Sequence, residues 1–171
     1  MLYRFLCTIF IFTICVSTYA QSIDKLDKAN GFKEFKIGKP KSKWVDEIKP
    51  LKNGAYKYLG ENAKAAFGSA INKLYLRFDS LGNLSGIYVS VKGLMGKDGV
   101  RGYKNIIGLA YGKESKMDDG DKKVKYYWFA TKLNFVLSAW ERGGTWDAEL
   151  DFCSPWQYAA DTSAQTNKAA D

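Results

Sequence analysis

The sequence predicts an α+β domain in which one or two short helices cover a mostly antiparallel sheet. The clearest indication is a hairpin, because apolar and polar residues alternate over 74–78 and a Gly- and Asn-containing turn at 79–83 leads into a second apolar-rich stretch. A second indication is the pattern near the C-terminal end, where short connections favour antiparallel pairing. The strand-like segments there are 125–130, 133–140 and 146–153.

In the first half of the chain, a short alternating stretch at 32–37 precedes a brief helix. The helix begins near Pro40, carries apolar residues on one side, and ends at Pro50, which cannot continue a helix. A short aromatic strand is expected at 56–59. The Ala-rich segment 61–70 is expected to form a loop or one helical turn.

The second half begins with a longer helix at 98–111. Asp98 is expected to cap its N-terminus, and Gly112 its C-terminus. A charged loop is expected at 112–123 before the three C-terminal strands. The apolar residues that share one face of this helix are Val100, Tyr103, Ile107 and Ala110.

The first 20 residues have the layout of a secretory signal peptide. An apolar run at 5–16 follows a charged start, and small residues precede a predicted cleavage site after Ala20. The run is shorter than the roughly 20 residues that span a bilayer, so no transmembrane segment is expected in the mature chain. We therefore predict a secreted or periplasmic protein. Its expected divisions are a signal peptide at 1–20, a loose lead-in at 21–30, a single globular domain at 31–157 and a disordered tail at 158–171.

The two halves of the domain have similar orders of elements. Each contains a short helix, a lone aromatic strand and a hairpin, which suggests a duplicated α-β-β-β unit. A chance likeness between two ordinary α+β halves explains the pattern equally well.

Three short motifs carry a resemblance to a known family. The runs FKIGKP at 35–40, WV at 44–45 and YKY at 56–58 resemble the opening of the small outer-membrane-assembly lipoprotein domain. Duplicated versions of that layout look like the β-lactamase-inhibitor-protein fold. The resemblance covers 32–90 and, more faintly, 103–153. It implies this fold and an envelope setting, transfers no functional residue, and does not extend to a lipid anchor.

Composition excludes several chemistries. The chain has 26 Lys and Arg, 18 Asp and Glu, a formal charge of +8, and no histidine. It therefore has no Ser-His-Asp triad, no Cys-His pair and no His zinc ligand. The acidic stretch 118–121 lacks the spacing of a calcium loop, so we expect no metal site and no cofactor. Cys153, which has no histidine to activate it, is expected to be a small buried residue.

Carboxylates form the first candidate site. Asp147, Glu149 and Asp151 alternate with apolar residues along the last strand, so they share one face. This spacing suits a pair of carboxylates that act as acid and base in a hydrolase. The alternative is that they are simply the wet face of an antiparallel strand.

Basic residues next to aromatic ones form the second candidate site, a binding site made of Lys122, Lys123, Lys125, Tyr127 and Trp128. Such a site suits an anionic envelope component, such as lipopolysaccharide, an anionic lipid or an acidic glycan. No motif indicates nucleic-acid binding, and none is expected. The alternative is that the aromatic residues fill the core while the lysines keep the protein soluble.

The combined expectation is a secreted or periplasmic protein that binds an envelope protein or an anionic envelope component and is not an enzyme. One alternative is an inhibitor or immunity-type protein, and another is a carboxylate-based hydrolase. A hydrolase requires the carboxylates to line a concave pocket with displaced pKa values. A binding protein instead requires a broad, shallow, aromatic-rich surface.

Overall fold

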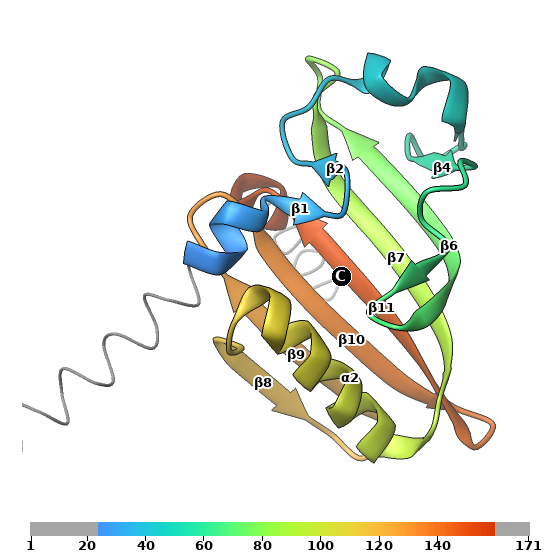
Figure 1. The fold of residues 1–171 in the computed structure, drawn as a ribbon, viewed down its shortest axis with the longest axis vertical. Coiled ribbons are helices and arrows are strands. Elements are labelled where there is room, and N and C mark those ends of the chain that lie inside the picture. The colour runs from blue at the N-terminus through green and yellow to red at the C-terminus, as the bar shows by residue number, and fades with distance from the viewer. Residues whose placement is uncertain (1–23, 160–171) are drawn as a thin grey trace, which may run out of the picture.

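Nine strands form one antiparallel sheet in the described part of the chain, residues 24–159 of a computed structural model (Figure 1). A two-stranded sheet of β1 (Gly31–Phe32) and β2 (Phe35–Lys36), the 3-10 helix η1 (Lys41–Glu47) and the helix α2 (Gly96–Tyr111) accompany it. The strands of the large sheet are β3 (Ile48–Pro50), β4 (Tyr56–Tyr58), β5 (Ala65–Ala66), β6 (Ser69–Phe78), β7 (Leu84–Leu94), β8 (Lys116–Asp119), β9 (Lys123–Phe129), β10 (Asn134–Arg142) and β11 (Thr145–Cys153).

The strand order is β3-β4-β6-β7-β11-β10-β9-β8, with β5 paired to β6. This order confirms the predicted α+β class with a mostly antiparallel sheet. Each half supplies a helix, an edge strand, a second strand and a hairpin, and the last strands of the two hairpins, β7 and β11, pair at the centre. The two halves thus occupy equivalent places on either side of the β7–β11 pair.

The predicted hairpin turn at 79–83 connects β6 and β7, and a side chain holds it in shape. The Asp79 carboxylate accepts hydrogen bonds from the Leu81 N–H at 3.0 Å and from the Asn83 N–H at 2.8 Å. The bond from Leu81, two residues along the chain, closes an Asx turn, which Asp favours because its short side chain reaches its own backbone. The expected strand 56–59 and the three C-terminal strands are also present, with ends shifted by a few residues.

Two segments that the sequence suggests are irregular are ordered elements. Part of the expected lead-in, 24–29, is helical, and its Leu26 is 1% exposed. The Asp27 carboxylate in this turn accepts hydrogen bonds from the Thr131 and Lys132 N–H groups at 3.2 and 2.7 Å. In the expected charged loop, Lys116–Asp119 pair with β9 as β8. Charged side chains suit such a strand because it lies at the edge of the sheet.

Smaller differences concern the ends of segments. Asp98 lies in the first turn of α2 and forms no cap, because the helix begins two residues earlier and Met95 occupies the N-cap position. The expected loop or helical turn at 61–70 instead contains β5 and the start of β6. Tyr158, assigned to the tail, belongs to the helical turn 155–159. The predicted signal peptide and residues 160–171 lie outside the described residues.

One face of the sheet, the covered face, carries a ladder of aromatic rings. Trp128 on β9, Phe135 on β10 and Phe152 on β11 are paired in register. The Phe135 ring stacks on Phe152 with centroids 4.3 Å apart and on Trp128 with centroids 4.7 Å apart. Phe32 of β1 stacks on Phe152 at 5.7 Å, so the ladder joins the small sheet to the large one. Stacking of this kind adds to the free energy of burial.

Helix α2 lies across the covered face and is held by buried hydroxyl groups (Figure 1). The Tyr103 hydroxyl donates to the Ala66 carbonyl at 3.0 Å, and the Tyr111 hydroxyl donates to the Gly31 carbonyl at 3.0 Å. Burial raises the pKa of both phenols. Ala110, which was expected on the apolar face of this helix, is exposed. Tyr111 is the buried residue at this end of the helix instead. Within residues 24–159, no helix has both the length and the apolar character needed to cross a bilayer.

Replacing Phe135 with Ala tests the importance of the ladder. Phe135 is fully buried between two rings, so the variant should lose about 3–5 kcal/mol of unfolding free energy in urea denaturation. The exposed residue Val45 provides a control, since Val45→Ala should change stability by at most about 0.5 kcal/mol. Similar losses of unfolding free energy in the two variants would contradict the importance given to the ladder.

Candidate functional site

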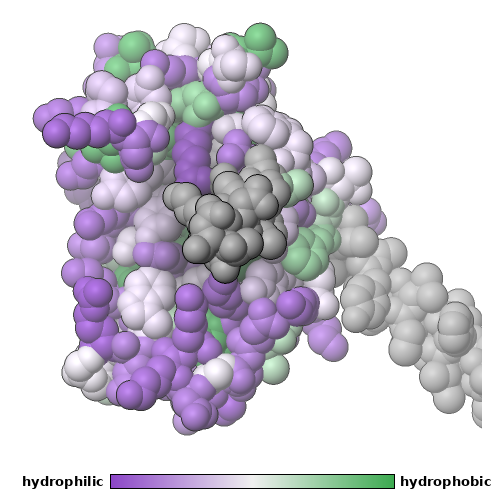
Figure 2. Space-filling view, turned by 180° about the vertical axis from the view of Figure 1, so that it is seen from behind, coloured by the Kyte–Doolittle hydropathy of each residue, from purple (hydrophilic) through white to green (hydrophobic). Residues whose placement is uncertain are grey.

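The other face of the sheet, the open face, carries polar and aromatic side chains. Because side chains alternate along a strand, each residue next to a core residue points to this face. Helix α2 lies against the covered face, whereas the helical turn 155–159 borders the end of the open face near Cys153. Figure 2 shows that hydrophilic and intermediate residues dominate the visible part of the open face.

Strand register arranges the open face in rows that run across the sheet. The central row is Lys73, Ser90, Glu149, Ser138 and Lys125, taken from β6, β7, β11, β10 and β9. It has a carboxylate in the middle, a serine on each side and a lysine at each end. The second row lies two residues away along each strand, on the same face. It consists of Tyr75, Tyr88, Asp151, Val136 and Tyr127.

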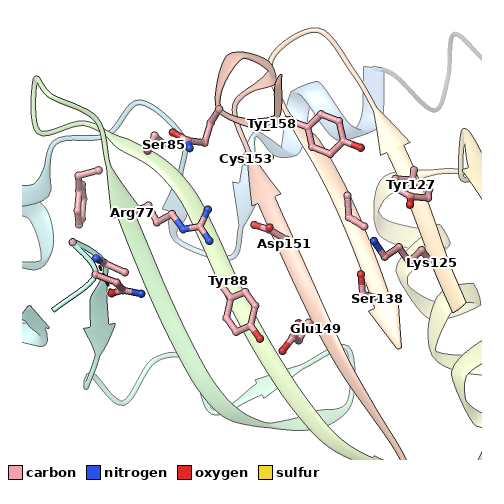
Figure 3. Close-up of a pocket in the computed structure, with 16 residues that line it drawn as sticks. Arg77, Ser85, Tyr88, Lys125, Tyr127, Ser138, Glu149, Asp151, Cys153 and Tyr158 are labelled. Carbon is pink, nitrogen blue, oxygen red and sulfur yellow. Dashed lines mark hydrogen bonds between the residues drawn. The ribbon is translucent and has the colours of Figure 1, made fainter. Parts of the chain in front are cut away.

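The open face is hollowed into a trough (Figure 3). One hollow of about 820 Å³ reaches from the Cys153 end to Lys125, and an adjoining hollow of about 460 Å³ reaches to Trp140 and Asp147. Both are lined by Arg77, Tyr88 and Glu149, so they form one continuous trough.

Arg77 and Asp151 point toward one another in the trough (Figure 3). Arg77 lies on β6 and Asp151 on β11, with β7 between these strands, and Gly86 of β7 is the residue paired with Arg77. A Cβ atom at Gly86 would be 3.5 Å from the Arg77 Cβ and 3.6 Å from its Cδ, so the arginine stem lies directly over this glycine. The arginine thus packs against β7 where it points toward Asp151.

Burial raises the pKa of Glu149, and the nearby carboxylate of Asp151 raises it further, while Lys73 opposes both effects. A half-buried acid with a second acid two residues away costs free energy when both ionise. Five cations also line the trough, so the two acids do not determine its overall charge. These cations are Lys73, Arg77, Lys92, Lys125 and Arg142.

The raised pKa of Glu149 predicts a pH-dependent stability. The folded protein holds this proton more tightly than the unfolded chain, where Glu has a pKa of about 4.3. Stability therefore falls as pH rises from that value through the raised folded pKa. Glu149→Gln has no carboxylate to ionise at this position, so it should not show this loss of stability. The increase in its urea midpoint over that of the unmodified protein should be larger at pH 7 than at pH 4. Equal pH-dependent gains in Glu141→Gln, an exposed acid on the same hairpin, would contradict this origin.

The structure brings the three predicted carboxylates together at the trough. Glu149 and Asp151 are half-buried in its floor, and Asp147 is 9% exposed at one end. The concave position and the raised pKa of Glu149 are both features expected of a hydrolase. Cys153, expected to be buried, is buried at the opposite end.

The predicted basic and aromatic site is divided between the two faces. Lys125 and Tyr127 lie on the open face, Lys123 is exposed at the start of β9, and Lys122 lies in the turn before it. The prediction that Trp128 belongs to this site is wrong. Its side chain is 1% exposed in the ladder, and its Nε1–H donates to the Gly112 carbonyl at 2.9 Å. Adjacent residues of a strand face opposite sides, so Trp128 cannot join Tyr127 in one site.

The edge next to Tyr127 is held by polar contacts. The Tyr127 hydroxyl donates to the Asp118 carboxylate at 2.8 Å, and the Lys116 ammonium lies 5.1 Å from the Tyr127 ring centroid. The hydrogen bond from Tyr127 and that from Lys116 lower the pKa of Asp118. Within residues 24–159, no three carboxylate, thiol or imidazole groups converge to hold a metal ion.

Several trough residues were not predicted as site residues. Tyr75 and Arg77 alternate with core leucines in the sequence, so their shared face could be predicted. Their position near Asp151 could not, because it depends on the pairing of β7 with β11. Tyr88, Ser90 and Ser138 enter the site for the same reason.

Comparison of the chain with protein-family models, with curated proteins and with solved structures found no match. The resemblance to the outer-membrane-assembly lipoprotein domain therefore rests on its short motifs alone.

Proposed function

We propose that this protein is a non-enzymatic binding or accessory protein of the cell envelope, exported by its N-terminal segment, and that its ligand occupies the open face. The observation that carries this proposal is the trough, which spans both halves of the sheet and is lined by Tyr88, Arg77 and Glu149. A concave surface that combines aromatic side chains with polar groups suits recognition of a ligand.

The aromatic residues of the open face support binding in particular. Tyr75 and Tyr88 are stacked at 5.7 Å, and Tyr127 and Phe129 are stacked at 5.8 Å. These two pairs lie on opposite sides of the central carboxylates, since β6 and β7 flank β11 on one side and β9 lies on the other. Rigid tyrosines provide contact area at a low cost in conformational entropy.

Photo-crosslinking tests the location of the ligand site. Benzoylphenylalanine at position 88, within the trough, should form crosslinks to a component of an envelope extract. The same group at the exposed Leu109 position, on α2, should not form them. Crosslinks of equal yield at both positions, or at position 109 alone, would overturn the assignment of the open face.

An inhibitor or immunity-type protein is a narrower version of the same proposal. It would use the open face to bind an enzyme or a toxin, and the identity of the component crosslinked at position 88 distinguishes it from other binding proteins.

A carboxylate-based hydrolase is the second candidate, because Glu149 has a raised pKa and lies with Asp151 in a concave site. We expect no turnover of nitrophenyl glycosides, esters or amides. Turnover that is lost in Glu149→Gln but kept in Glu141→Gln would favour the hydrolase instead.

A further inference from the structure

We propose that the ligand of the trough is an extended oligosaccharide that carries acidic groups. This inference rests on the proposed function, since it names the class of ligand for the same open face. Three features of the trough support it: the polar floor, the aromatic walls and the excess of cations.

The floor of the trough consists of groups that hydrogen-bond with hydroxyls. Glu149 lies between Ser90 and Ser138 in the central row. A carboxylate accepts several hydrogen bonds, and a serine hydroxyl both donates and accepts. Adjacent hydroxyls on a sugar ring have the same dual capacity, so neighbouring floor residues match neighbouring hydroxyls.

The same floor is poorly suited to a protein partner. The buried centre of a protein–protein interface is depleted in Glu, Asp and Ser. Here Glu149 and Asp151, with two serines beside Glu149, occupy the centre of the trough. A folded partner would have to desolvate these groups, whereas a sugar replaces their water with its own hydroxyls.

Ser85 supports the same proposal independently of these three features. This residue is 4% exposed and lines the larger hollow, yet its Oγ has no hydrogen-bond partner among the described residues. A buried hydroxyl without a hydrogen-bond partner costs free energy, and a bound group that pairs with it removes this cost. A ligand hydroxyl at the Cys153 end of the trough would satisfy it.

The walls provide aromatic rings for the apolar faces of sugar rings. Tyr88 and Tyr127 line the larger hollow on opposite sides of Asp151, and Trp140 lines the smaller one. From Cys153 to Asp147, β11 rises by about 20 Å, which is enough for several linked rings.

The charges of the lining favour acidic groups on the sugar chain. Five cations face three carboxylates in the trough, and the lysines lie at both ends of the central row. Arg77 can bind a carboxylate or phosphate through two parallel hydrogen bonds. Sugar hydroxyls would thus contact the central acids, and acidic substituents would reach the flanking cations.

Titration calorimetry on residues 21–171, which include every described residue, tests this proposal. The acidic probes are hexasaccharides of galacturonic acid, of mannuronic acid and of heparin. The comparison probes are maltohexaose, which is neutral, and hexaglutamate, which is acidic but not a sugar. At least one acidic hexasaccharide should bind at least about tenfold more tightly than either comparison probe.

Variants assign the binding to the trough. Glu149→Gln and Tyr88→Ala should each weaken binding of that hexasaccharide by about tenfold, because they remove a hydrogen-bonding carboxylate and an aromatic wall. Glu141→Gln, matched in chemistry but outside the trough, should bind as the unmodified protein does. Thermal unfolding of each variant shows whether a loss of binding reflects a loss of folding.

Four results would overturn the proposal: no binding of the three acidic hexasaccharides, equal binding of hexaglutamate, equal binding of maltohexaose, or full affinity in a folded Glu149→Gln variant. If none of the sugars binds but position 88 crosslinks to a protein, the glycan ligand is wrong and the proposed function stands. If position 88 also forms no crosslink, both are wrong.

Discussion

Stacking of Trp128, Phe135 and Phe152 is the interaction on which the rest of the molecule depends. The three rings place β9, β10 and β11 in register, and Tyr111 of α2 and Phe32 of β1 pack against the same ladder. A shift of one residue in any of these strands would move a ring of this size into water. The ladder therefore determines which side chains face outward.

The trough is a consequence of that register. Once alternate residues fill the covered face, their neighbours Tyr127, Val136 and Asp151 must share the open face. The energetic cost falls on Glu149, whose carboxylate is held half-buried beside another acid. The fold can bear this cost because burial of the apolar side chains on the covered face stabilises it.

Sequence patterns predicted the local elements but not their long-range arrangement. Alternation located the strands, and the Asp79 turn located the first hairpin, because both signals depend on neighbouring residues. The strand β8 and the helical turn around Leu26 were missed, since each depends on pairing or packing against distant segments. For the site, the shared face of the acids was predicted, whereas Trp128 was assigned to the wrong side and the tyrosines of β6 and β7 required the sheet order.

The symmetry of the central row has a consequence for how a chain-like ligand is oriented. Lysine, serine, glutamate, serine and lysine follow one another in the same order from either edge. For the proposed glycan, which would run along β11, a serine and a lysine therefore flank Glu149 on both sides of the sugar chain. Groups on either edge of that chain would meet the same pair of residues, whichever edge faces β7.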